Sequence, residues 1–157
     1  MVTLNTKDLV LKEYEEKYVL SAHNNFLSQE ETAKYTLWRP TSSVEEAKAK
    51  LEYWNSDKDS VLFWLVFEKN SDAAIGFVSA ANLGNGVYGN VGIAIGLDYI
   101  NKGYGSQVLE ALIYYISKLG GVEIHYSHFE GNDASKNLAL KYGFEYYCIG
   151  KKVKRIA

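Results

Sequence analysis

Cysteine, proline and long apolar segments are almost missing from this 157-residue chain, and each absence excludes a class of protein. Cys148 is the single cysteine, so no disulfide can form within the chain, and a reducing cytoplasm is the expected location. No apolar run approaches the roughly 18 residues that a membrane-spanning helix needs, so no membrane partner is expected. The first twenty residues mix charges throughout, which is not typical of a secretory signal peptide.

The chain also has little excess of one charge over the other. The formal net charge is −2, whereas broad nucleic-acid binding needs clustered Lys and Arg to neutralise phosphates. The basic residues of 151–155 form a short tail that is expected to be a solvated end, so no nucleic-acid partner is predicted. The three histidines, the cysteine and the carboxylates show no metal-ligand spacing, and no metal is predicted.

The composition that remains is that of a globular protein, and the length fits a single domain, 1–157. Apolar spacing predicts strands and helices, and Ser43 with Glu46 predicts a capping box at one helix start. The order of these elements predicts an α/β (α+β mixed) fold in which helices cover a mixed sheet. The strands are expected at 9–14, 61–67, 74–83, 91–97, 122–129 and 144–149, and the helices near 18–27, 43–54, 107–119 and 132–141.

The strand expected at 91–97 is bulky on one face and nearly bare on the other, because successive side chains alternate between faces. Such a strand lets another group approach its backbone closely. Two interpretations stay open: a helix packs tightly on the bare face, or a ligand lies against it. The bulky face carries Val91, Ile93, Ile95 and Leu97, and the bare face carries Gly92, Ala94 and Gly96.

A glycine-containing loop joins this strand to the helix near 107–119. The start of a helix exposes unpaired amides and the positive end of the helix dipole, so it attracts anions. Gly103 and Gly105 remove Cβ atoms where a phosphate has to approach, and Lys102 and Ser106 add a charge and a hydroxyl. The spacing matches neither a Walker loop nor a full dinucleotide motif. Strand, loop and helix together predict a pyrophosphate site.

Two separated motifs extend this prediction to a family. The loop Ile100-Asn-Lys-Gly-Tyr-Gly105 is similar to the Trp-Gly-Lys-Gly-Tyr-Ala common among ribosomal-protein alanine N-acetyltransferases. Asn132-Asp-Ala-Ser135 and Lys141-Tyr-Gly-Phe144 match the Asn-x-x-Ser and Lys-x-Gly-Phe that follow in the same proteins. The chain therefore resembles the GNAT superfamily of N-acetyltransferases over nearly its whole length. The resemblance implies a mostly antiparallel mixed sheet of about six strands flanked by about four helices.

The resemblance also implies acetyl-CoA as cosubstrate and direct transfer of the acetyl group to a primary amine, either of a small molecule or of a protein N-terminus. The backbone near Ile95 and Leu97 would pair with the pantetheine arm, which separates this strand from the strand at 122–129. Asn132 and Ser135 would be the catalytic residues, with Ser135 as the acid for the departing thiolate and Asn132 also contacting the cofactor. The CoA pyrophosphate would bind the amides of Asn101, Lys102, Gly103, Tyr104, Gly105 and Ser106.

Several alternatives accompany these assignments. Ser135 could instead satisfy a local amide in the first turn of its helix. His125, His128 and Glu145 are the candidates for the general base. Asn90 stands where relatives often have an acidic residue, and Tyr147 where they often have glutamate. These two departures motivate a second function, a CoA-binding sensor or interaction module that has lost catalysis.

The C-terminus and the tryptophans carry two further expectations. Only thirteen residues follow Phe144, which fits one strand, so we hypothesise that the final strand of the family's sheet is missing. The exposed sheet edge would then be covered by a second subunit in a homodimer.

Trp38 and Trp54 fall where this fold forms its acceptor side, although core packing is the ordinary role of such residues.

Overall fold

A single mixed sheet organises the protein, in the strand order β1-β2-β3-β4-β5-β6-β8-β7. The computed structural model describes residues 1–34, 38–127, 132–148 and 151–155, and for β7 and β8 it describes the backbone. All neighbouring strands are antiparallel except β5 and β6, which are parallel. The strands are β1 Leu4–Asn5, β2 Leu9–Lys12, β3 Val61–Glu68, β4 Ala74–Gly84, β5 Val87–Ile95, β6 Glu123–Ser127, β7 Glu145–Cys148 and β8 Lys151–Arg155.

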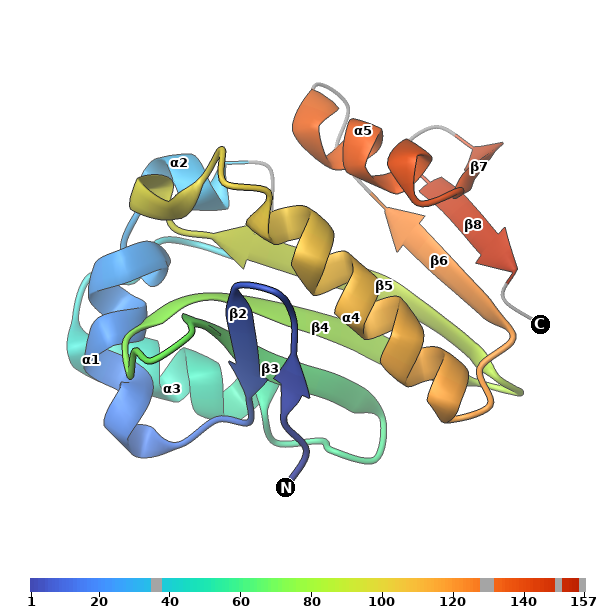
Figure 1. Cartoon of the computed structure of the whole chain (residues 1–157). Helices are drawn as coiled ribbons and strands as arrows, with labels where there is room; N and C mark the ends of the chain where they lie inside the picture. The colour runs from blue at the N-terminus through green and yellow to red at the C-terminus, as the bar shows by residue number, and fades with distance from the viewer. Residues whose placement is uncertain (35–37, 128–131, 149–150, 156–157) are drawn as a thin grey trace.

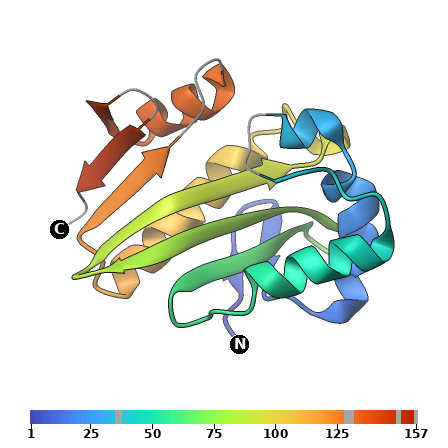
Figure 2. The ribbon, with the colours of Figure 1, turned by 180° about the vertical axis from the view of Figure 1, so that it is seen from behind.

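Helices cover both faces of the sheet, as Figure 1 and, from behind, Figure 2 show. On one face α4 packs against the sheet around Val108, Leu112 and Ile116, which are fully buried. On the other face a second buried cluster joins the N-terminal helical segments and α3 to β3 and β4. The helical elements are η1 Glu16–Tyr18, α1 Val19–Ala22, η2 His23–Leu27, α2 Glu30–Ala33, α3 Val44–Trp54, η3 Leu97–Tyr99, α4 Tyr104–Lys118 and α5 Asp133–Lys141.

The predicted α/β fold, with a mostly antiparallel mixed sheet flanked by helices, is confirmed. All six predicted strands are present, and β1 and β8 are added to them. The predicted cap also forms, because the Ser43 hydroxyl accepts a hydrogen bond from the Glu46 amide at 3.1 Å. The Glu46 carboxylate differs from the expected box, since it accepts from the amide and hydroxyl of Ser42.

Parallel strands β5 and β6 pair only where they begin and then separate. Their register pairs are Val87 with Glu123 and Tyr88 with Ile124. The register of β5 with β4 then shifts at a bulge, where Asn90 has a left-handed backbone with φ 51°. A bulge bends its strand and increases the local twist. The ribbons of β5 and β6 diverge beyond this point in both views (Figures 1 and 2).

The hypothesis of a missing final strand is wrong. Two strands follow Phe144: β7 at Glu145–Cys148 and β8 at Lys151–Arg155. The β8 strand lies between β6 and β7 and pairs with both in antiparallel register. The lysines of β8 are typical of a solvated tail, whereas pairing on both sides depends on backbone groups rather than on apolar side chains. The homodimer remains a prediction, but a missing strand no longer supports it.

Candidate active site

The glycine loop ends in an open helix terminus. Asn101 and Gly103 both have left-handed backbones, with φ 63° and 78°, and α4 begins directly after Gly103. The first backbone bond of the helix runs from the Gln107 amide to the Gly103 carbonyl at 3.3 Å. The amides of 104–106 therefore precede the hydrogen-bonded ladder, as at any helix start. A Cβ added at Gly103 would meet no atom within 4 Å, so the loop is open to a ligand on that side.

Tyr104 anchors this loop to the sheet. Its side chain is buried, and its hydroxyl donates to the Glu68 carboxylate of β3 at 2.5 Å. That hydrogen bond raises the pKa of Tyr104 to about 12, with burial adding to the shift. Lys102 lies 3.9 Å from the same carboxylate and keeps its side chain half exposed. Tyr104 thus has a structural role, while Lys102 remains at the loop surface.

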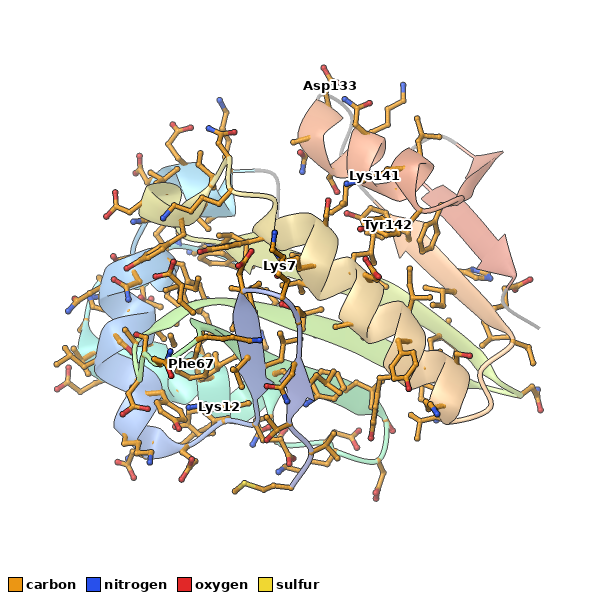
Figure 3. All side chains as sticks on the ribbon, viewed as in Figure 1. Lys7, Lys12, Phe67, Asp133, Lys141 and Tyr142 are labelled. Carbon is orange, nitrogen blue, oxygen red and sulfur yellow. The ribbon has the colours of Figure 1, made fainter. Side chains whose placement is uncertain are left out.

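The end of α5 is tied to the first half of α4 by polar contacts. Lys141 and Tyr142 reach from α5 toward α4 (Figure 3). The Lys141 ammonium donates to the Ser106 hydroxyl at 3.1 Å, and the Tyr142 hydroxyl donates to the Glu110 carboxylate at 3.2 Å. A cation therefore already lies beside the helix terminus at which we predict a phosphate site.

A cavity of about 820 Å³ opens where β5 and β6 have separated. Its polar end is formed by β6 and α5, its edge by the bulge of β5, and its opposite wall by aromatic side chains. Asp57 is the one charged side chain among the described residues that line it. The lining residues are Trp38, Tyr53, Trp54, Ser56, Asp57, Val61, Phe63, Phe77, Ser79, Asn90, Val91, Gly92, Ile93, Tyr126, Ser127, Asn132 and Ser135.

Ser135 and Asn132 both line the cavity and are joined to each other. The Asn132 side-chain oxygen caps α5 by accepting from the Ser135 amide at 3.3 Å. This leaves the Ser135 hydroxyl free to contact Tyr126 of β6, whose hydroxyl oxygen lies 2.7 Å away. Tyr126 is 3% exposed, and burial raises the pKa of its phenol. The role of Tyr126 was not predicted from the sequence, because only the strand register directs its side chain toward Ser135.

The two interpretations of the bare β5 face apply to different glycines. At Gly96 a Cβ would overlap the Asn25 carbonyl of η2, so this glycine serves close packing. At Gly92 a Cβ would lie 3.1 Å from the Ser79 hydroxyl and 3.5 Å from the Phe77 ring, at the wall of the cavity. The bare face therefore carries both a packing contact and part of the candidate site.

One edge of β5 faces the opening. The Gly96 amide donates to the Ile75 carbonyl of β4 at 2.8 Å. Because amides alternate between the two edges of a strand, those of Ile93 and Ile95 point away from β4 and toward the gap. Leu97 differs from expectation, since it begins η3 and its amide donates to the Gln29 side chain at 3.0 Å.

The candidate bases are not gathered at the cavity. His125 lies beside Gly89, nearer the closed end of the gap, and is absent from the described lining residues. Its Nε2 atom is 2.7 Å from the Glu123 carboxylate. His128 and the Glu145 side chain lie outside the described part of the chain. Within the described residues, no group of three or more potential ligands could hold a metal ion.

The site combines a parallel strand pair that separates, a glycine loop and an open helix start. The chain belongs to the GNAT acetyltransferases, because a family model described as "Acetyltransferase (GNAT) domain" matches residues 8–145. A search of curated proteins found no match. Across the described residues, no helix has both the length and the apolar character needed to cross a bilayer.

Solved structures with low sequence identity share the fold. A RimL ribosomal L7/L12 alpha-N-protein acetyltransferase in complex with coenzyme A superposes with a TM-score of 0.84 at 18% identity, covering 99% of this chain and 98% of that one. The acetyl transferase from Salmonella typhimurium that modifies the N-terminal serine of L7/L12 gives 0.82 at 19% identity, covering 99% and 100%. The microcin C7 self immunity acetyltransferase MccE, in complex with acetyl-CoA and AMP, gives 0.80 at 18% identity, covering 96% and 94%.

Proposed function

We propose that this enzyme uses acetyl-CoA to acetylate a primary amine by direct transfer between β5 and β6. One observation carries the proposal: the carboxyl ends of β5 and β6 separate, and each leads into one half of the site. After β5 come the glycine loop and the open start of α4. After β6 comes α5, which brings Ser135 to Tyr126. Ligands of open α/β sheets commonly bind where parallel strands end and part.

The residues present fit acetyl-CoA. The amides of 104–106 and the open loop at Gly103 would hold the pyrophosphate, and Lys102 and Lys141 would supply positive charge nearby. The amides of Ile93 and Ile95 would pair with the amide-containing pantetheine arm along the free edge of β5. An amide on this edge would also face the oxygen on which negative charge develops, where a fixed donor stabilises the transition state most.

When bound, acetyl-CoA supplies a thioester whose carbonyl carbon is attacked by a neutral amine. Ser135 would donate its hydroxyl proton to the departing sulfur as the carbon–sulfur bond breaks, and the proton released by the newly acylated nitrogen would restore the serine hydroxyl, so the protons balance. Tyr126 would donate to the Ser135 oxygen, which leaves the serine proton free to point into the cavity. Because burial raises the pKa of Tyr126, its phenol stays protonated at neutral pH. Asn132 would fix the backbone of this turn through its cap.

The acceptor cannot be carried over from the solved structures, because they serve different purposes. The RimL protein is described as acting on the alpha-amine of a ribosomal protein, and MccE as a self immunity enzyme. We therefore carry over to this chain only acetyl transfer to an amine and not a particular acceptor.

The departure at Asn90 bears on the alternative of a non-catalytic CoA-binding module. Asn90 occupies the bulge with φ 51°, a conformation that asparagine tolerates better than most residues. The backbone conformation at the bulge therefore explains why an asparagine occupies this position. The alternative predicts acetyl-CoA binding without transfer to any amine.

The test measures CoA release from acetyl-CoA with a panel of primary amines. We expect amine-dependent release that falls about 100-fold in Ser135→Ala. Ser117→Ala, which removes an exposed hydroxyl near the end of α4, serves as the matched control and should retain full activity. Acetyl-CoA binding with no release for any amine would contradict the proposal and support the non-catalytic module.

A further inference from the structure

One wall of the cavity consists of four aromatic rings that contact one another. Trp54 of α3 lies 4.9 Å from Phe77 of β4 and 6.1 Å from Phe63 of β3, measured between ring centroids. Phe63 and Phe77 stack at 5.9 Å, and Trp38 meets Trp54 edge-on at 6.1 Å. All four line the cavity, and together we call them the aromatic wall. Rings in such mutual contact form a surface suited to a further ring.

The aromatic wall begins beside the strand edge where transfer would take place. A Cβ on Gly92 would lie 3.1 Å from the Ser79 hydroxyl and 3.5 Å from the Phe77 ring, so the wall reaches β5 beside Ser79. An amine placed at this strand must therefore direct its nearest substituent against the rings. The substituent next to the reacting nitrogen is the part of the acceptor that the wall selects.

The charges around the wall disfavour a cationic substituent. Lys50 already places its ammonium 5.8 Å from the Trp38 ring centroid and 5.5 Å from that of Trp54. It thus occupies the cation–π position of these two indoles. Lys50 is partly buried there, and this burial lowers the pKa of its ammonium. Asp57 is the single carboxylate among the described lining residues, too few to pair the several charges of a polyamine.

We propose that the acceptor is a small primary amine carrying a neutral aromatic ring, of the arylalkylamine class. The inference rests on the proposed acetyl transfer and adds the substrate class. A cavity of about 820 Å³ is within the usual range for small-molecule sites and is large enough for such an amine beside the acetyl donor. The ring would lie on the aromatic wall, and the amine would point toward Gly92 and Ser135.

The test compares kcat/KM for phenethylamine, n-butylamine, spermidine and a peptide with a free N-terminal serine. We expect phenethylamine to exceed each of the others by at least about 10-fold, the discrimination that a fitted apolar pocket provides. Trp54→Leu should lower kcat/KM for phenethylamine at least about 10-fold and leave n-butylamine within about twofold. The control Tyr114→Leu changes an exposed aromatic residue of α4 and should alter neither substrate.

The outcomes separate the two proposals. Faster transfer to spermidine or to the peptide than to phenethylamine would overturn the aromatic acceptor and leave acetyl transfer standing. No transfer to any amine would overturn both. Trp54→Phe, which keeps a smaller ring, replaces Trp54→Leu if the latter does not fold. Its kcat/KM for phenethylamine should fall between those of the wild type and of a variant without the ring, and an unchanged value would contradict contact with the wall.

Discussion

The hydroxyl oxygen of Tyr126 on β6 lies 2.7 Å from that of Ser135 on α5, inside the cavity where β5 and β6 separate. The contact joins α5 to β6, and both residues line the cavity. A serine hydroxyl rotates freely unless a partner fixes it, and Tyr126 supplies that partner.

A double-mutant cycle tests whether Tyr126 acts through Ser135. We expect Tyr126→Phe to lower kcat about 10-fold and Ser135→Ala about 100-fold, each with little change in KM for acetyl-CoA. The double variant should match Ser135→Ala, because a positioning residue has no effect once the residue it positions is gone. Initial rates of CoA release measure all four enzymes. Multiplicative losses in the double variant would show that Tyr126 acts independently of Ser135.

Two substitutions at Gly103 that differ only in charge test whether the glycine loop binds the pyrophosphate. Asn and Asp both tolerate the left-handed backbone of Gly103, and the loop has room for a side chain. Gly103→Asp should raise KM for acetyl-CoA at least about 10-fold more than Gly103→Asn, because its carboxylate repels the pyrophosphate. Added salt should reduce the difference through screening. Equal KM values for the two variants would place the phosphates elsewhere.

The left-handed backbone at the Asn90 bulge predicts how substitutions there change the free energy of unfolding. Asn90→Gly should change the free energy of unfolding by less than about 0.5 kcal/mol, because glycine adopts positive φ readily. Asn90→Val should destabilise by about 1–2 kcal/mol, because a β-branched residue is strained at φ 51°. Urea unfolding of both variants measures the difference. Equal stability of the valine and glycine variants would contradict the left-handed bulge.

The hydrogen bond from Tyr104 to Glu68 predicts a loss of stability at alkaline pH. The pKa of Tyr104 is raised from 10.0 to about 12, so the folded protein holds this proton at pH values where the unfolded chain has released it. The contribution, on the order of 2 kcal/mol, is complete below pH 10 and is lost as pH rises toward 12. Unfolding free energies should therefore fall more steeply between pH 10 and 12 in the wild type than in Tyr104→Phe. Parallel curves would contradict the raised pKa.

Local patterns predicted much of the fold because each acts over a few residues. The cap at Ser43, the glycine before α4 and the alternation of Val91 and Ile93 were all readable from spacing, and all are present. The strand β8 was not, because its pairing is set by β6 and β7 rather than by its own sequence. Short apolar spacing gave no indication of it.

The site was predictable only where a motif is contiguous. The loop 100–106 and the pair Asn132 and Ser135 are read directly from sequence, and the structure brings Asn132 and Ser135 to the cavity. Tyr126 and the aromatic wall are not contiguous, since they depend on strand register and on packing between distant segments. A single asparagine in a strand does not by itself reveal a bulge, so the opening at Asn90 was also missed.

The central claim is that this fold binds acetyl-CoA between β5 and β6, and a melting experiment tests it most directly. The purified protein is heated with acetyl-CoA, with ATP as the phosphate-bearing control. At about 100 times its dissociation constant, acetyl-CoA should add about 2.7 kcal/mol and raise the melting temperature by several degrees, and Gly103→Asp should reduce the shift. ATP should leave the melting temperature unchanged. No shift with acetyl-CoA, or an equal shift with ATP, would contradict the account.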